Sequence, residues 1–317
     1  MNLHKSALDL WNIIRDDEDN RRYHKDLHPG LLFYSFFDGD IKDSESKKKH
    51  LERMSRQSPA SSARYLFEQR KKELQMLNSS GYIVRAWTQK LQRPLASGLG
   101  IESALENGIT LDHTYGLPVL MGSALKGICQ DQYLEDKGVI FQPEERWKVK
   151  NSLEFIAVFG LQTPLSDERG FGTEWQEKAI RGRVIFFDAV PVPPRQGEWL
   201  PFDGKAGFMN PHYGDYYQNA DPPGDYLKTN PIGFPTIKEG TVFLFSVAIR
   251  TIPEEIVLKR IPSAEVPKPP PESYSFDPEK SAGETRVLLQ SAMQERGAGA
   301  KTRVDYGSFG KPDDFPL

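Results

Sequence analysis

The 317-residue sequence has almost none of the features that mark secreted, membrane or thiolate-metal proteins. Cys129 is its only cysteine, which rules out an intramolecular disulfide and a thiolate-rich metal site, so we expect a buried thiol. No stretch reaches the roughly 18 apolar residues of a membrane span, and residues 1–20 lack the apolar core of a secretory signal. We therefore expect a cytoplasmic protein with no membrane association.

Common catalytic and nucleotide-binding motifs are also missing. There is no HExxH helix, GxSxG elbow, paired Cys/His spacing, GxxxxGK[ST] loop, or GxGxxG after a strand. Asp112 and His113 are a conceivable acid–base pair, but adjacent side chains on an extended segment point to opposite faces. We expect no catalysis by this chain, and neither a cofactor nor a metal site.

The net charge of −3 argues against a protein that coats nucleic acid through the field of its whole surface. Any nucleic-acid contact must then be local. Hydrophobic residues make up 38% of the chain and charged residues 27%, which suits a folded globular protein.

The hydrophobic pattern predicts a helical extension followed by one mixed domain. Residues 1–80 read as charged helices packed on the main domain, and Tyr65, Leu66, Leu74 and Leu77 lie near helical spacing. Residues 81–317 form the main domain. Two long irregular segments interrupt it: an insertion at about 190–240 and a Pro-rich connector at about 253–280.

Six elements define the predicted core of this domain. One helix begins at an N-cap Ser123, and the other begins with a capping box of Ser281 and Glu284 and stops at Gly297. The four strands are expected at 83–91, 182–189, 241–250 and about 303–309. The resulting order, βαββαβ, is that of the α+β, ferredoxin-like (RRM-type) fold.

Three segments are candidate contact sites. In residues 106–127, Gly108, Gly116 and Gly122 permit close backbone approach, and Ser123 opens a helix whose free N–H groups favour an anion such as an RNA phosphate, with Lys126 one turn on. Gly127 within this helix suggests tight packing. An ordinary connection from strand to helix is the alternative.

The second segment, residues 295–307, is a glycine-rich turn with Arg296, Lys301 and Arg303 around it. Its amides and cations suit a sugar–phosphate backbone, although a glycine C-cap before a solvated basic strand would look similar. The third segment, residues 207–226, carries soft or flat side chains, among them Met209 and His212, that would stack on bases or simply anchor the loop.

These segments together resemble the RAMP superfamily of CRISPR proteins, and within it most closely the family of the sixth subunit of the Cmr (type III-B) effector complex. The resemblance is spread over nearly the whole chain in the family's order. Its motifs are HPGLLF (28–33), ENGITLDHTYGLPVLMGSALKG (106–127), VFG (158–160), GRVIFFDAVP (182–191), MNPHYGDYY (209–217) and GAGAKT (297–302).

The resemblance implies a RAMP domain that acts as a non-catalytic backbone subunit in antiviral defence. Its expected partners are CRISPR guide RNA, held near the guide's 3′ end, target RNA, and other RAMP backbone subunits of the complex. The 190–240 insertion corresponds in position to the thumb that interrupts the guide–target duplex. Expected RNA-binding residues are His113, Gly122, Ser123, Lys126, Arg181, Arg183, Met209, His212, Tyr213, Gly297, Gly299, Lys301, Thr302 and Arg303.

The sequence departs from the family at one position, and two alternative functions stay open. The family's glycine-rich end usually continues with GYG, whereas here Asp305 precedes Tyr306-Gly307, and a carboxylate would repel phosphate. One alternative is a RAMP-type endoribonuclease acting on guide precursor or target RNA through His113, Asp112 and Lys126. The other is a protein scaffold whose glycines serve only the fold.

Overall fold

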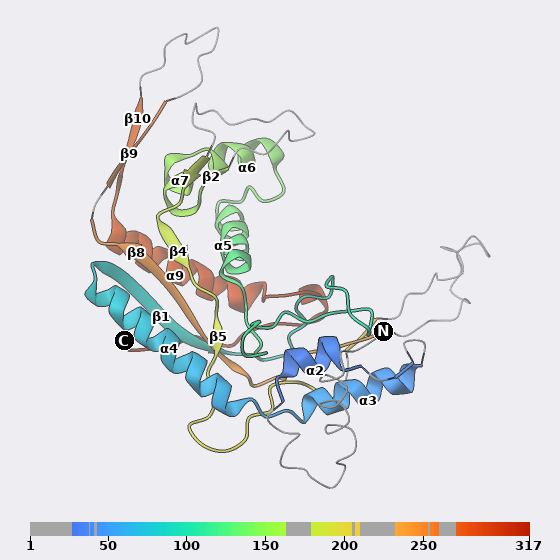
Figure 1. Cartoon of the computed structure of the whole chain (residues 1–317). Coiled ribbons are helices and arrows are strands. Elements are labelled where there is room, and N and C mark those ends of the chain that lie inside the picture. Colours follow the sequence, from blue (N-terminus) through green and yellow to red (C-terminus); the bar gives the residue numbers. More distant parts are fainter. Residues whose placement is uncertain are drawn as a thin grey trace, which may run out of the picture.

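The protein is described here from a computed structural model with mixed helix and strand (Figure 1). The residues that the structure describes are 27–37, 39–40, 43–162, 179–204, 207–209, 232–252, 254–259 and 271–317.

Two long strands form the centre of the main sheet. β1 (Tyr82–Lys90) pairs antiparallel with β8 (Val242–Arg250) along its full length, from Tyr82 opposite Arg250 to Lys90 opposite Val242. β11 (Asp313–Asp314) lies at the outer edge of β1, and β4 (Val184–Phe186) at the outer edge of β8. The order is β11-β1-β8-β4, and β5 (Val190–Pro191) also pairs with β8.

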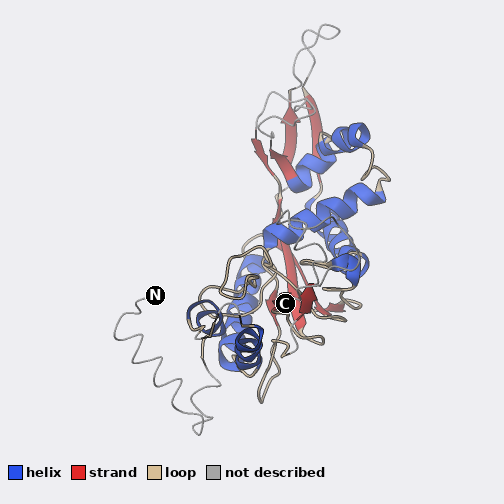
Figure 2. Ribbon diagram, turned by 90° about the vertical axis from the view of Figure 1, so that its right-hand side faces the viewer, coloured by secondary structure: helices blue, strands red, loops and turns tan. Residues whose placement is uncertain are grey.

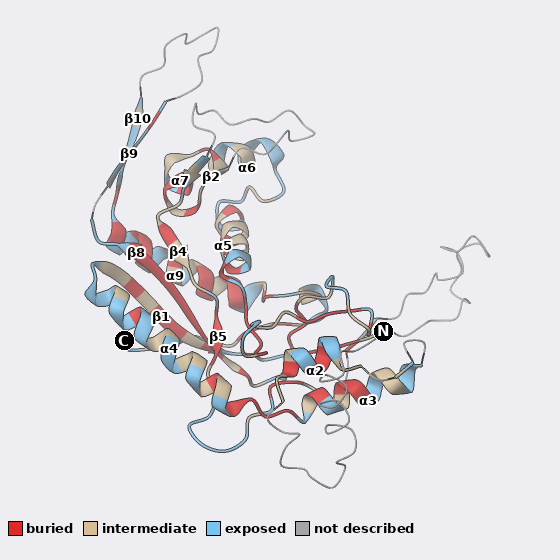
Figure 3. Cartoon of the chain, in the orientation of Figure 1, coloured by how far each residue is buried: buried red, intermediate tan, exposed pale blue. Residues whose placement is uncertain are grey.

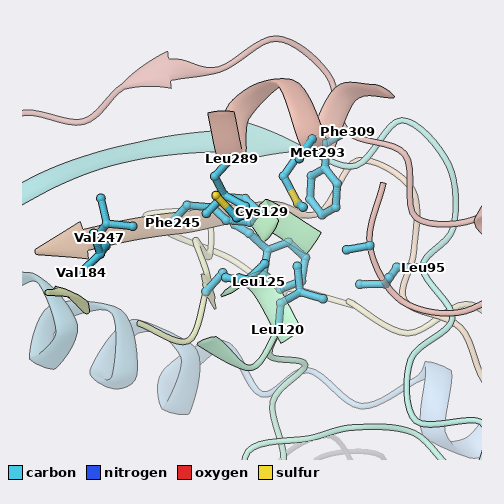
Figure 4. Packing of buried hydrophobic residues seen from close by; sticks show 14 of the residues in the cluster. Leu95, Leu120, Leu125, Cys129, Val184, Phe245, Val247, Leu289, Met293 and Phe309 are labelled. Carbon is cyan, nitrogen blue, oxygen red and sulfur yellow. The ribbon is translucent and has the colours of Figure 1, made fainter. Parts of the chain in front are cut away.

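Two helices cover one face of this sheet, α5 (Gly122–Asp136) and α9 (Pro278–Glu295). Figure 4 shows Leu125 and Cys129 of α5 gathered with Leu289 of α9 near Phe245 of β8. Cys129 is fully buried, as expected from the sequence, and burial raises the pKa of its thiol. This is the larger part of the core.

The opposite face is covered by α4 (Ala60–Ser79). Leu74 of α4 shares a buried cluster with Val84 of β1 and with Leu244 and Ala248 of β8. Because strand side chains alternate between faces, each central strand supplies both cores. Ala60, Ala63 and Leu74 of α4 are buried, and Figure 3 shows most of the rest of this helix as exposed or intermediate.

Shorter elements surround this core. α2 (Pro29–Ser35) and α3 (Ser44–Ser55) contact each other, and Phe33 and Met54 are buried in the main core cluster. Figures 1 and 2 place a second group beyond one end of the sheet. Its elements are α6 (Pro143–Lys150), α7 (Leu153–Phe159), the pair β2 (Gly160–Gln162) and β3 (Ala179–Arg181), and the pair β9 (Glu254–Leu258) and β10 (Glu272–Phe276).

The predicted strand at 303–309 is wrong. Residues Thr302–Val304 form a short 3₁₀ helix, η1, between Lys301 and Asp305, which both adopt left-handed backbone conformations. Phe309 makes a single bridge to Leu91, and the edge strand β11 follows four residues later. The chain curls here because the preceding turn is bonded to residues 94–96, which takes it out of an extended conformation.

Both helix starts also differ from the prediction. The N-cap of α9 is Asp277, whose carboxylate accepts from the amides of Glu279 and Lys280, so the predicted Ser281 capping box is wrong. Helix α5 begins at Gly122 with Met121 as N-cap and no side-chain cap bond, so Ser123 is inside the first turn. Within the predicted strand 182–189 only β4 (Val184–Phe186) forms, and β5 (Val190–Pro191) lies just beyond its predicted end.

Candidate functional site

The glycine-rich turn at 297–307 is folded tightly against residues 94–96. Gly297, Gly299 and Gly307 have φ angles of 71°, 86° and 68°, in the left-handed region that favours glycine. A Cβ atom at Gly299 would lie within 3.0 Å of the Ala96 carbonyl oxygen, and one at Gly307 would meet Ala298 equally closely. These glycines are required by close backbone approach.

Most backbone amides of this turn are used by the protein itself. The Ala300 amide donates to the Ala96 carbonyl at 2.7 Å, and the Ala298 amide to the Gly307 carbonyl at 2.9 Å. The Gly307 amide donates to the Pro94 carbonyl at 2.8 Å. The expected row of free amides is therefore wrong for these positions. What the turn presents outward is the short helix η1 and the exposed Arg303.

Lys301 connects this turn to the root of the long insertion. Its ammonium group lies 5.8 Å from the centre of the Phe234 ring, and Phe234 and Tyr306 have ring centres 5.6 Å apart. Phe234 ends β7 (Ile232–Phe234), which pairs with β6 (Gly207–Met209), the strand that carries Met209. The turn thus lies against β7, whose partner β6 is the described part of the predicted segment 207–226. His212 and Tyr213 fall outside the described residues.

Asp305, the departure from the family pattern, is paired with a cation. Its carboxylate lies 2.8 Å from Nε of Arg93, and both side chains are more than half exposed. The pair offsets the repulsion that this carboxylate would exert on a nearby phosphate, and the turn keeps the partly exposed Lys301 and the exposed Arg303 as cations.

The first turn of α5 receives a carboxylate from the protein. The Gly122 amide donates to Oδ1 of Asp188 at 2.6 Å, and a Cβ at Gly122 would lie within 3.0 Å of the Phe186 carbonyl oxygen. Gly122 therefore serves the contact between α5 and the β4–β5 segment, as in the alternative of an ordinary connection. A Cβ at Gly127 would meet nothing within 4 Å, so the inference of tight packing there is wrong.

Asp112 and His113 lie on a surface turn beside the start of α2. Oδ1 of Asp112 accepts from the amides of Thr114 at 3.0 Å and Tyr115 at 2.8 Å, which stabilises the turn. His113 is exposed. Nearby, Gly116 packs on the ring of His28, whose Nδ1 caps α2 by accepting from the Leu31 amide. The Asp112 carboxylate thus has a structural role in this turn.

Two predicted cations from distant parts of the chain meet at a hollow of about 680 Å³. Lys126 comes from α5 and Arg181 from the end of β3, and Lys150 at the end of α6 joins them. Arg183 lies next to this hollow, and its amide donates to the Ala157 carbonyl at 2.8 Å. Burial lowers the pKa of Lys126 and, with the neighbouring charge of Arg146, that of Lys150.

Sequence reasoning missed Lys150 because its neighbours in the chain gave no signal. It is one of several charged residues on a short polar helix, and only the packing of α6 beside α5 and β3 brings it to the hollow. Across the described part of the chain, no group of three or more His, Cys, Asp or Glu residues is placed to hold a metal ion. The same residues include no helix long and apolar enough to cross a membrane.

The overall arrangement is shared with a solved CRISPR assembly. A chain in the cryo-EM structure of the type III-B Cmr-β complex bound to cognate target RNA superposes with a TM-score of 0.54 at 15% identity, covering 97% of this chain and 99% of that one. This protein therefore has the mixed helix-and-strand fold of a CRISPR effector-complex protein.

The particular family follows from sequence. The CRISPR system Cmr subunit Cmr6 of Pyrococcus furiosus is 31% identical over an alignment of 268 positions, which covers 73% of this chain and 68% of the relative. The chain belongs to the Cmr6 family, and the resemblance seen in its motifs is confirmed. The crystal structure of Pyrococcus furiosus Cmr6 is 25% identical, with a TM-score of 0.38 over 73% of this chain and 98% of that one. No family model matches the chain.

Proposed function

We propose that this protein is a non-catalytic backbone subunit of a cytoplasmic type III-B effector complex that binds guide RNA near its 3′ end. Contributions to guide–target duplex binding and to assembly with other RAMP subunits are part of the same proposal. Family membership supports it. The observation that carries it is the contact of Lys301 in the glycine-rich turn with Phe234 of β7, the strand paired with β6, which carries Met209.

We also propose that the core is a ferredoxin-like RAMP domain. The elements β1, α5, β4, β8, α9 and β11 follow one another as βαββαβ. Their strands are arranged fourth, first, third and second across the sheet, every neighbouring pair is antiparallel, and both helices pack on one face. This order and cover are those of the split βαβ arrangement.

In such a subunit the protein recognises the RNA backbone, while base pairing reads sequence. Contacts to phosphates fix position and carry no sequence information, and guide–target pairing supplies specificity. Lys301 and Arg303 on the rim of a protein whose net charge is −3 provide a local contact of this kind.

Replacing Lys301 by glycine tests the proposal sharply. Glycine adopts the left-handed conformation of this position, with φ of 60°, without steric cost, so a loss of RNA binding cannot come from backbone strain. In the reconstituted effector complex we expect weaker guide binding, with the slope of log K against log salt reduced by about 1.

Lys280→Ala is the matched control for Lys301→Gly. Lys280 is an exposed lysine in the first turn of α9, at the opposite end of that helix from the glycine-rich turn. It should leave guide binding unchanged. Equal behaviour of the two variants, together with an inert Arg303→Ala, would sink the proposed RNA contact at this turn.

The non-catalytic part of the proposal has its own test. The Asp112 carboxylate is engaged by two turn amides, which argues against a role for it beside His113. The purified subunit, incubated with guide precursor and with target RNA, should leave both intact with and without divalent metal. Cleavage that disappears in His113→Ala would instead establish the endoribonuclease alternative.

A further inference from the structure

The hollow beside α5 has its own set of cations, separate from those of the glycine-rich turn. Lys126, Lys150 and Arg181 reach it from three different elements, α5, α6 and β3. None of the described residues that line it is acidic. Three positive charges therefore converge on one concave surface whose described lining carries no carboxylate.

The surroundings of Lys150 show how this differs from an ordinary solvated face. Two residues earlier on α6, Lys148 is held by Glu145 at 2.7 Å. Lys150 instead has the like charge of Arg146 among its neighbours, and the Asp131 carboxylate, 3.7 Å from Arg146, offsets this only in part. Repulsion between like charges in a partly desolvated hollow is unfavourable. A bound anion would offset this repulsion.

The floor of the hollow is rigidly built. A Cβ at Gly160 would lie within 3.0 Å of the Ile180 carbonyl oxygen, and one at Gly182 would approach Val158 equally closely, so the end of α7 and strand β3 pack backbone to backbone. Phe155 and Phe159 beneath are buried. The cations are thus carried on fixed elements, and binding would need little ordering of the backbone.

The wall of the hollow is apolar next to the cations. Leu161, Ile180 and Ile185 line it and are each only partly buried, so apolar surface is open to a ligand. A cationic rim against an aliphatic wall matches the two parts of a nucleotide, a phosphate and a flat, weakly polar base. A small inorganic anion would use only the rim.

We propose that this hollow is a second RNA-contact site, which takes one nucleotide of the strand with its phosphate between Lys126, Lys150 and Arg181 and its base on the aliphatic wall. The inference rests on the proposed function, since it needs RNA to be bound by the assembled complex. It adds a position distinct from the glycine-rich turn, and it adds Lys150 to the contact residues.

The test is a charge-removing triple variant, Lys126→Gln, Lys150→Gln and Arg181→Gln, in the reconstituted complex with guide and target RNA. We expect weaker RNA binding and a shallower salt dependence, with a slope lower by about 1 for each cation that contacts a phosphate. Photocrosslinking with thiouridine-substituted RNA should label peptides of α5 or β3 in the parent complex. Lys148→Gln, on the same helix as Lys150 but held by Glu145, is the matched control.

The possible outcomes separate this inference from the proposed function. If Lys301→Gly weakens RNA binding while the triple variant matches Lys148→Gln, the hollow is overturned as an RNA site and the proposed function stands. If neither weakens binding, both fail. If inorganic phosphate raises the Tm of the isolated subunit through these three residues but RNA binding and crosslinks are unaffected by the triple variant, the hollow is a small-anion site and the inference is wrong.

Discussion

Two glycines of α5, five residues apart, have opposite relations to their surroundings. Gly122 faces the backbone of β4, whereas the space beside Gly127 is open. The sequence offers the same letter at both positions and cannot distinguish them, because the difference lies in a strand some sixty residues further along the chain.

This difference gives a paired prediction on stability. Gly122→Ala should lower the free energy of unfolding by about 1–3 kcal/mol, because the added methyl group overpacks the contact with Phe186. Gly127→Ala should raise it by about 0.5–1 kcal/mol, since alanine is the better residue in a helix interior. Urea unfolding followed by circular dichroism measures both, and destabilisation by Gly127→Ala would contradict the open space seen there.

The glycine-rich turn illustrates what residue-level reasoning can reach. The sequence predicts a glycine-rich turn that follows a helix ending at Gly297, and Gly297 and Gly299 both have positive φ. The predicted role of the amides beside them is wrong, since the Ala298 amide donates to the Gly307 carbonyl and the Ala300 amide to the Ala96 carbonyl. Nor could the sequence pair Asp305 with Arg93, which lies over 200 positions away.

At the scale of elements, long strongly patterned segments were predictable and short ones were not. β1, β8 and α5 are each nine residues or longer and carry their own hydrophobic pattern. β11 consists of two aspartates, residues with low strand propensity, and exists because the chain is brought alongside β1. Such elements are products of tertiary structure.

The true start of α9 can be checked by removing its cap. Asp277→Ala should cost about 1 kcal/mol of unfolding free energy, because two amides of the first turn lose their acceptor. Glu284, the partner in the wrongly predicted capping box, is exposed and its replacement by alanine should change stability by at most about 0.5 kcal/mol. A larger effect at Glu284 than at Asp277 would mean that the helix begins where the sequence pattern put it.

At the scale of the whole molecule, residues 313–317 lie at one edge of the sheet and contact helices on both of its faces. The Phe315 ring lies 5.8 Å from that of Phe67 on α4, and Asp314 forms an ion pair with Arg286 of α9. The last residues therefore join both helical layers while covering part of the outer edge of β1. No local pattern signals this role.

Deleting residues 313–317 should therefore expose the edge of β1. We expect a lower Tm and concentration-dependent self-association, because unpaired strand edges pair with other chains. Thermal unfolding and size-exclusion chromatography over a range of concentrations measure the two effects. Lys311→Ala is the control just upstream, and a monomeric truncated chain with unchanged Tm would show that these residues do not protect the sheet.

The sequence predicted which cations belong to the candidate sites, but it did not predict how they are grouped in space. Lys126, Arg181, Lys301 and Arg303 were singled out as cations near glycines, but their division into two surfaces depends on how α6, β3 and the turn are placed. That placement comes from packing between segments that are remote in sequence.

The contact of Lys301 with Phe234 makes two parts of the chain energetically dependent on each other. A nucleotide that draws the ammonium group away removes an attraction worth about 0.5–2 kcal/mol from the strand that ends at Phe234. Linkage is reciprocal. If a nucleotide at the turn changes the affinity of a ligand for β6 and β7, that ligand changes the affinity of the turn for the nucleotide by the same factor. Binding at one region would thereby change the affinity of the other, without the movement of a domain between them.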